Sequence, residues 1–217
     1  MRSNDLTTTD MIDIESRIAA YGEASEVGGT AQVVNPHFRA IKSLRPAAVL
    51  VPIVMREDGP TLMFTQRTDH LEHHPGQVSF PGGHVEEGDE TPEETALRET
   101  EEEVGLHRRH IDIIGRLDTY LTSTGFSVTP VVARATPPFE INPDPVEVAE
   151  VFEVPLAFLL DTGNHLRETR LFGDQTWYAY AMPYNGYHIW GVTAGMVRNF
   201  YEILSGAPIT LKTDSRY

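Results

Sequence analysis

The spacing of hydrophobic residues near the N-terminus predicts a helix. Met11, Ile14 and Ile18 recur three and four residues apart, as residues on one face of a helix do. The helix would cover residues 11–21, with Asp10 as a candidate N-cap. The stretch that follows is rich in Gly, Ala and Ser, which predicts a linker before the main folded region.

From residue 47 onward, short apolar runs with β-branched residues predict strands. Residues 48–54 and 62–65 are two such runs, and Asp58-Gly59 between them is a strong hairpin signal. Further strands are predicted at residues 78–80, 111–117, 128–133, 148–154, 167–172 and 176–181, with a turn at Gly173-Asp174, and helices at 155–160 and 191–204. These elements do not alternate regularly, so they favour an α/β fold with a mixed sheet covered by helices over a doubly wound parallel sheet.

The chain length and composition limit the function classes. A chain of 217 residues fits one domain with extensions, and we expect an N-terminal extension over 1–34 and a main domain over 35–217. The absence of cysteine excludes disulfides and thiolate chemistry. A net charge of -15 disfavours nucleic acid and anionic membranes as partners. With no apolar stretch of membrane-spanning length and no signal-like N-terminus, we expect a cytoplasmic protein.

The segment around residues 81–106 carries the chemistry. Thr91 fits an N-cap, Pro92 the first helical position, and Glu94 completes a capping box with Thr91. Gly105 suits the position just after the last turn. The sequence therefore predicts a helix from about Pro92 to about Val104, whose residues Ala96, Leu97, Thr100 and Val104 would pack on the sheet.

A second face of this helix carries three carboxylates. Glu99, Glu102 and Glu103 are three and four residues apart, so they repel one another unless a cation joins them. Hard oxygen ligands suit Mg²⁺ or Mn²⁺. Arg98 can pair with Glu102, whereas Glu101 is expected on the solvated side. A solvated acidic helix is the alternative, but Gly82-Gly83 upstream would let the backbone approach a ligand and expose the Gly83 carbonyl.

This segment resembles the Nudix box, whose pattern ends in Arg-Glu, a bulky aliphatic residue, any residue, Glu-Glu, any residue, Gly and an aliphatic residue. Residues 98–106 match that half, with Thr100 in place of the first aliphatic residue. In the first half, Asp89 stands where the box has Glu, and its gap to Arg98 is one residue longer than usual. The coenzyme A pyrophosphatase-like branch of the family shares this spacing.

The segment before the box also resembles that branch. Agreement is found at Thr65, Arg67, Leu71, His74, Gly76, Phe80 and the Pro-Gly-Gly of residues 81–83. Glu72 departs from the pattern, because the branch has an arginine there. Shorter likenesses lie at 115–118, 124–126, 128–131 and 189–191, so the resemblance covers roughly residues 47–200.

The resemblance implies an α/β/α sandwich that uses Mg²⁺ or Mn²⁺ to cleave the diphosphate bond of a nucleoside diphosphate derivative, with coenzyme A favoured. It implies catalytic roles for Arg98, Glu99, Glu102 and Glu103, with Glu102 as either a third metal ligand or the water-orienting base. The metal ligands would be Glu99, Glu102, Glu103, the Gly83 carbonyl and an acidic residue outside the box, for which Glu147 is favoured over Glu150. Arg67 and His74 would contact substrate.

Several alternatives stay open at this level. The substrate could be ADP-ribose, a dinucleotide or a modified dNTP, and the chain could be a non-catalytic nucleotide-binding module, although a binder has no need of three crowded carboxylates. Arg67 could instead form a surface salt bridge. His70, His73 and His74 have the spacing of zinc ligands on a helix, but the Pro75-Gly76 that follows favours a loop of solvated or substrate-edge histidines. A homodimer is compatible with the sequence.

Overall fold

The computed structural model describes residues 11–24, 43–71, 74–122, 124–172 and 175–206. Most of its strands belong to one eight-stranded sheet with the order β3-β2-β1-β7-β5, to which β4 adds beside β1, β6 beside β7 and β8 beside β2. The strands of this sheet are β1 (Arg45–Val54), β2 (Thr61–Arg67), β3 (Val78–Ser79), β4 (Gly82–His84), β5 (Ile111–Arg116), β6 (Tyr120–Leu121), β7 (Phe126–Ala135) and β8 (Val148–Pro155). A second, antiparallel sheet has the order β11-β10-β9, with β9 (Leu166–Phe172), β10 (Gln175–Tyr184) and β11 (Tyr187–Trp190).

The large sheet is mixed, as predicted. β1 runs parallel to β7, with Ala47 opposite Val128, and antiparallel to β2 and β4, with Ile53 opposite Leu62. The predicted hairpin between β1 and β2 is confirmed, and Gly59 in its turn has a φ of 116°, which glycine adopts without strain. Mixed pairing of this kind excludes a doubly wound parallel sheet.

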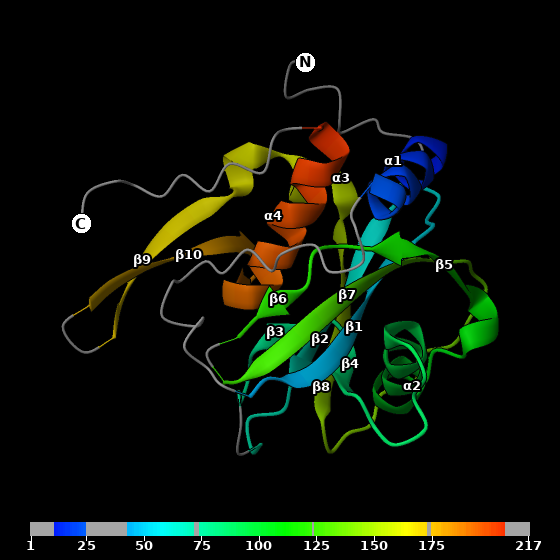
Figure 1. The fold of residues 1–217 in the computed structure, drawn as a ribbon, viewed down its shortest axis with the longest axis horizontal. Helices are drawn as coiled ribbons and strands as arrows, with labels where there is room; N and C mark the ends of the chain where they lie inside the picture. The colour runs from blue at the N-terminus through cyan, green and yellow to red at the C-terminus, as the bar shows by residue number, and fades with distance from the viewer. Residues whose placement is uncertain (1–10, 25–42, 72–73, 123, 173–174, 207–217) are drawn as a thin grey trace.

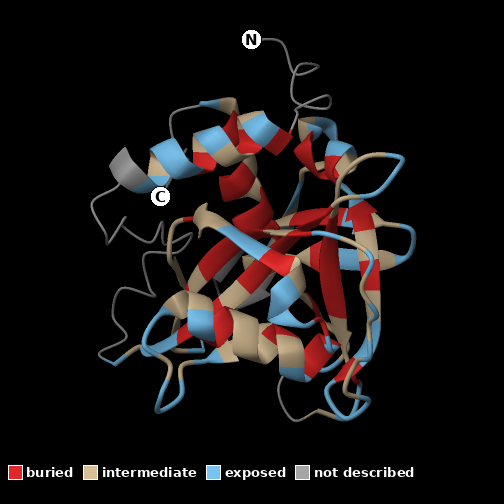
Figure 2. Cartoon of the chain, turned by 90° about the vertical axis from the view of Figure 1, so that its right-hand side faces the viewer, coloured by how far each residue is buried: buried red, intermediate tan, exposed pale blue. Residues whose placement is uncertain are grey.

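Helices cover both faces of this sheet (Figures 1 and 2). One face packs against α2 (Pro92–Val104), and the other packs against α1 (Met11–Ala24), α3 (Leu156–Leu160) and α4 (Gly191–Ser205). Two 3-10 turns complete the fold, η3 (Arg108–His110) and η4 (Thr162–Asn164). The α/β architecture with a mixed sheet between helices is therefore confirmed. Among the described residues, no helix has the length and hydrophobicity needed to cross a membrane.

The N-terminal helix packs into the same core as the main sheet. Ile14 and Ile18 are fully buried, and Met11 is nearly so, in a cluster that also contains Phe64 and Phe200. Burying an isoleucine side chain contributes about 1.5–3 kcal/mol, so α1 adds substantially to the stability of the sheet. The expected boundary near residue 34 and the candidate N-cap Asp10 lie outside the described residues.

The predicted elements are confirmed within a few residues, with some corrections. The first helix extends through Ala24, into the stretch expected to be linker. Three short strands were not predicted, namely β4, β6 and β11. β4 and β6 contain three and two residues, too few for a hydrophobic period to appear. The turn predicted at Gly173-Asp174 lies outside the described residues.

Candidate active site

The start and end of α2 follow the local sequence. The Thr91 hydroxyl accepts a hydrogen bond from the Glu94 N–H over 3.3 Å, and the Glu94 carboxylate accepts one from the Thr91 N–H over 3.2 Å. Pro92 occupies the first turn, and Gly105 ends the helix with a φ of 73°. The capping box and the glycine C-cap predicted from the sequence are confirmed, and they fix which side chains of α2 face the sheet.

The buried face of α2 carries the side chains that were predicted to pack on the sheet and, in addition, one carboxylate. Ala96, Thr100 and Val104 are fully buried, as predicted, and Leu97 is half-buried against the same core cluster. Glu103 lies on this side too, with a relative exposure of 6%. The three carboxylates therefore differ in their exposure to solvent. Glu103 is buried, whereas the side chain of Glu102 is 60% exposed.

Glu103 lies against the glycine turn that precedes the helix. The backbone N–H of Gly82 donates to its Oε2 over 3.1 Å, and Nη1 of Arg67 is 3.9 Å from its Oε1. Burial raises the pKa of Glu103 to about 8, and the neighbouring negative charges of Glu99 and Glu147 act in the same direction, against the Gly82 hydrogen bond and the charge of Arg67. A buried carboxylate among like charges is stabilised by a bound cation.

The two glycines of the turn are required for different reasons. A Cβ on Gly83 would lie 2.3 Å from Oε1 of Glu99, so the backbone of Gly83 lies directly against that carboxylate. A Cβ on Gly82 would lie 2.4 Å from the Ala48 carbonyl oxygen in β1, and the φ of Gly82 is 152°. The turn therefore brings main-chain atoms into contact with the carboxylate face of α2, as the sequence predicted.

Arg98 binds more groups than the sequence predicted. The expected contact with Glu102 is present, with Nη1 to Oε2 at 3.1 Å, and Nη1 also donates to Glu99 over 3.0 Å. Nη2 donates to the His84 carbonyl oxygen and to Asp89. The side chain thus joins two of the three predicted ligands to the loop between β4 and α2.

Asp89 is the acidic residue that departs from the usual box, and the structure shows its contacts. Its carboxylate accepts hydrogen bonds from Arg98, from the Glu86 N–H at 3.0 Å and from the Thr95 hydroxyl at 3.0 Å. The hydrogen bonds from Arg98 are the main reason that the pKa of Asp89 lies well below its ordinary value. Although the gap between Asp89 and Arg98 is one residue longer than in the usual box, the Asp89 carboxylate still reaches the Arg98 guanidinium. From the sequence, Asp89 was noted as a departure from the usual box that matches the spacing of one branch, and this pairing was not predicted.

The loop before β8 brings Glu147 towards Glu103. The N–H groups of Asn142 and Asp144 donate to the carbonyl oxygens of Val104 and Glu103, so the loop wraps around the end of α2. The Glu147 carbonyl then accepts from the Thr68 N–H over 3.0 Å. The exposed Glu147 is close enough to raise the pKa of Glu103, whereas Glu150 lies on β8 opposite Gln66.

Arg67 ends β2 beside this loop. Its backbone N–H donates to the Gln77 carbonyl oxygen, and its side chain is 26% exposed. Among the described residues, its Nε is the only buried side-chain nitrogen or oxygen without a hydrogen-bond partner. A buried donor of this kind costs free energy unless an acceptor reaches it, so Arg67 retains donor capacity beside Glu103.

The donor set fits a hard divalent cation in its chemistry. The carboxylates of Glu99 and Glu103 and the Gly83 backbone offer oxygen atoms, which suit Mg²⁺ or Mn²⁺. In the conformation described, Arg98 holds Glu99 and Glu102, and no three acidic or imidazole side chains of the described residues form a group that could bind a metal ion. A bound cation would therefore compete with Arg98 for these oxygens.

Other predicted residues lie away from this cluster or outside the described residues. His74 is exposed with a φ of 56°, and its Nδ1 is 3.0 Å from Oε1 of Gln77. The segment around His70 and His74 is a loop, as predicted, and His73 and Glu72 lie outside the described residues. Glu101 was expected to be solvated, but its carboxylate is hydrogen-bonded to the backbone and guanidinium of Arg108 and is only 25% exposed.

Comparisons with known proteins show the family to which the chain belongs. Residues 44–173 match the NUDIX domain family. A relative described as the uncharacterized Nudix hydrolase NudL of Escherichia fergusonii is 41% identical over 171 residues, which cover 77% of this chain and 87% of the relative. NudL of Escherichia coli strain K12 is likewise 41% identical over 171 residues, with the same coverage. A crystal structure of RenU, a Nudix hydrolase from M. smegmatis, has a TM-score of 0.52 at 18% identity and covers 77% of this chain and 90% of that one, which shows a shared fold. The chain belongs to the Nudix family.

Proposed function

We propose that this protein hydrolyses the diphosphate bond of a nucleoside diphosphate derivative, with Mg²⁺ or Mn²⁺ held by the carboxylates of α2. In this reaction a water oxygen forms a bond to one phosphorus. The bond from that phosphorus to the bridging oxygen breaks, and a proton leaves the water. The bound cation would neutralise charge on the phosphoryl oxygens and favour deprotonation of the water. Glu99 and Glu103 would hold the cation, with Glu102, Glu147 and the Gly83 carbonyl as further ligands.

The observation that carries this proposal is the position of Glu103. This carboxylate is buried, receives one backbone hydrogen bond and lies near the negative charges of Glu99 and Glu147. Such an arrangement is unfavourable for the apo protein, because like charges at low dielectric repel. A divalent cation bound by these carboxylates would replace the repulsion with attraction. In an acidic helix whose carboxylates are all solvated, water screens the repulsion and no cation is required.

The remaining side chains divide into two roles in this proposal. Arg98 positions Glu99 and Glu102 through its bonds to both and through its anchor at Asp89. Glu102 is the most exposed of the three carboxylates, so it is the best placed to meet a water molecule at the substrate. Arg67 would donate its unpartnered Nε–H to a phosphate oxygen, which would give that buried donor an acceptor.

For the substrate we favour coenzyme A, on the strength of the motif over residues 65–83 and the Asp89 spacing. Glu72 argues against it, because a carboxylate near a substrate phosphate repels that phosphate. A basic residue could compensate, and Arg45 is the described member of the upstream group that also contains Arg39 and Lys42. Its guanidinium lies 4.1 Å from the centre of the Phe126 ring. ADP-ribose and dinucleotides remain the alternative substrates.

The decisive experiment is a substrate panel assayed with Mg²⁺, with Mn²⁺ and with a chelator. Coenzyme A, ADP-ribose and dinucleotides would be compared by phosphate-ester product release. We expect metal-dependent turnover with coenzyme A as the preferred substrate. A far higher rate on ADP-ribose would reject the coenzyme A branch but keep the enzyme class. Tight nucleotide binding without turnover of any panel member would support a binding module and reject the hydrolase proposal.

We propose that residues 1–34 form an extension to a Nudix domain over 35–217, that the protein acts in the cytoplasm, and that it can form a homodimer. Size-exclusion chromatography with light scattering tests the last of these. A monomer at all accessible concentrations would exclude the homodimer.

A further inference from the structure

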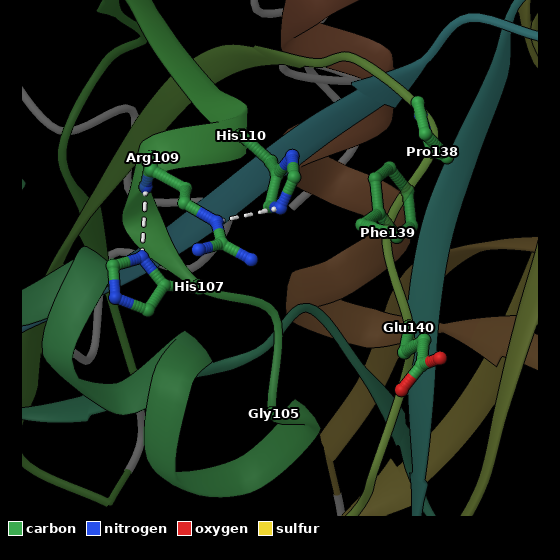
Figure 3. Close-up of a pocket in the computed structure, with 7 residues that line it drawn as sticks. All are labelled: Gly105, His107, Arg109, His110, Pro138, Phe139 and Glu140. Atoms are coloured by element: carbon green, nitrogen blue, oxygen red, sulfur yellow. Dashed lines mark hydrogen bonds between the residues drawn. The ribbon is translucent and has the colours of Figure 1, made fainter.

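A pocket lies beyond the C-terminal end of α2 and shares no residue with the candidate active site (Figure 3). One wall is the turn after the helix, with His107, Arg109 and His110, and the other is the segment with Phe139 and Glu140. Its volume is about 560 Å³, within the range of small-molecule sites. We call it the Arg109 pocket.

Arg109 is held so that its terminal nitrogens remain available. Its backbone N–H donates to Nδ1 of His107 over 3.1 Å, and its Nε donates to Nε2 of His110 over 3.0 Å. No carboxylate of the described residues forms an ion pair with it, unlike Arg108, which is bound to Glu101. Figure 3 shows one terminal nitrogen of Arg109 on the side that faces the Phe139 wall and the other on the side of His107. Together they offer N–H donors to the oxygens of a phosphate or carboxylate.

The opposite wall contains the Phe139 ring, over which the Arg56 guanidinium carbon lies 5.5 Å from the ring centre, and a hydrogen-bond acceptor. The Phe139 ring is half-buried and lies 6.0 Å from the His110 ring, centre to centre, at an angle of 57°. Beside it, the Glu140 carboxylate is exposed and can accept hydrogen bonds from an amino group. The last carbonyl groups of α2 do not compete for the ligand, because those of Glu103 and Val104 already accept from the loop at residues 142–144.

A ligand that satisfies both walls is anionic at one end and carries a planar ring with an amino group at the other. We infer that the Arg109 pocket binds an aminopurine nucleoside monophosphate, with the phosphate at Arg109, the ring against Phe139 and the amino group towards Glu140. A simple anion would leave the aromatic wall unused, and the net charge of -15 disfavours anions that gain only one contact. The inference does not depend on the proposed hydrolysis.

The test uses AMP as the probe and the full chain with a chelator present, so that no metal loads the candidate active site. Isothermal titration would measure binding, and backbone amide shifts in NMR spectra would locate it. The variants are Arg109→Gln and Phe139→Ala, and the matched control is Arg108→Gln, which changes the adjacent arginine but not the pocket. Melting curves confirm that each variant is folded. We expect both pocket variants to weaken AMP binding at least about tenfold and the control to leave it unchanged.

Inorganic phosphate and adenosine separate the two halves of the ligand. Each should bind at least about tenfold more weakly than AMP, since each uses one wall only. Phosphate or adenosine binding as tightly as AMP would overturn the inference. It would also be overturned if AMP did not bind at about 10 mM, or if either pocket variant bound AMP as well as the wild type did.

Discussion

The guanidinium of Arg98 binds both oxygens of the Asp89 carboxylate, with Nε 3.2 Å from Oδ1 and Nη2 3.0 Å from Oδ2. Paired contacts of this kind fix the orientation of a guanidinium as well as its position. Because the same guanidinium contacts Glu99 and Glu102, the loop before α2 controls two of the proposed ligands.

Asp89→Asn should therefore reduce both stability and activity. The amide cannot pair with both nitrogens of Arg98, and we expect a loss of about 2 kcal/mol in the free energy of unfolding. The pKa of Asp89 is lowered in the folded state, so its stabilisation is present above the unfolded pKa and is lost as the pH falls below it. Urea unfolding from pH 7 to pH 3 should give a smaller pH dependence for the variant. The exposed Glu87→Gln is the control, and an equal effect there would contradict the assignment.

The glycine turn predicts opposite outcomes for two adjacent substitutions. In Gly83→Ala the three atoms nearest to the added Cβ belong to the end of the Glu99 side chain, which can rotate away. Folding should survive with a loss within about 1 kcal/mol, while turnover falls because a proposed ligand is displaced. In Gly82→Ala the Cβ meets the backbone of β1 at a positive φ, so the melting temperature should fall strongly. Equal melting temperatures for the two variants would refute this distinction.

Removal of the proposed metal ligands should abolish turnover. On a substrate identified by the panel, Glu99→Gln and Glu103→Gln should each lower kcat by about 10²–10³-fold or more, because each removes a charged ligand. Glu101→Gln is the matched control on the same helix, since Glu101 binds Arg108 instead of the site. If both variants retained near-normal turnover, the metal-site assignment would be wrong.

The metal-free protein should tolerate the change at Glu103. A glutamine can still accept the Gly82 N–H, and it replaces a carboxyl group whose charged form is disfavoured by burial and by the negative charges of Glu99 and Glu147. We expect metal-free Glu103→Gln to unfold at the same or a slightly higher temperature than the wild type. A large decrease in melting temperature would show that the carboxylate is structural.

His165 should make stability depend on pH on the other side of the sheet. Its Nε2 donates to the Leu159 carbonyl oxygen over 2.7 Å, and its Nδ1 lies 3.3 Å from Nη1 of Arg198. Burial is the main reason that the pKa of His165 is lowered. Its contribution to stability is therefore complete above the unfolded pKa of about 6.5 and decreases as the pH falls below it.

Chemical unfolding between pH 7.5 and pH 5 would measure this effect. The wild type should lose stability towards pH 5, and His165→Gln should lose less over the same range. The exposed His70→Gln serves as the control and should behave like the wild type. An unchanged pH dependence in His165→Gln would exclude this residue as the cause.

The sequence by itself determined the local features of the site. The helix from Pro92 to Val104, its capping box and its glycine end depend on residues at most four apart, so their identities are sufficient to predict them. The register of the helix then places Glu99, Glu102 and Glu103 on adjacent positions, and the two glycines before it predict a close backbone approach. These interactions are short in sequence and need no knowledge of the rest of the fold.

Only the tertiary structure decided how those carboxylates differ. Glu103 is buried and Glu102 exposed because the backbone of β4 packs beside β1 and against one side of α2, a pairing between segments more than thirty residues apart. The approach of Glu147 and Arg67 to Glu103 depends likewise on the loop around the end of α2 and on the antiparallel pairing of β2 with β8. A periodic pattern states which face of an element is apolar but not which distant segment covers it, so these contacts emerge only when the chain is folded.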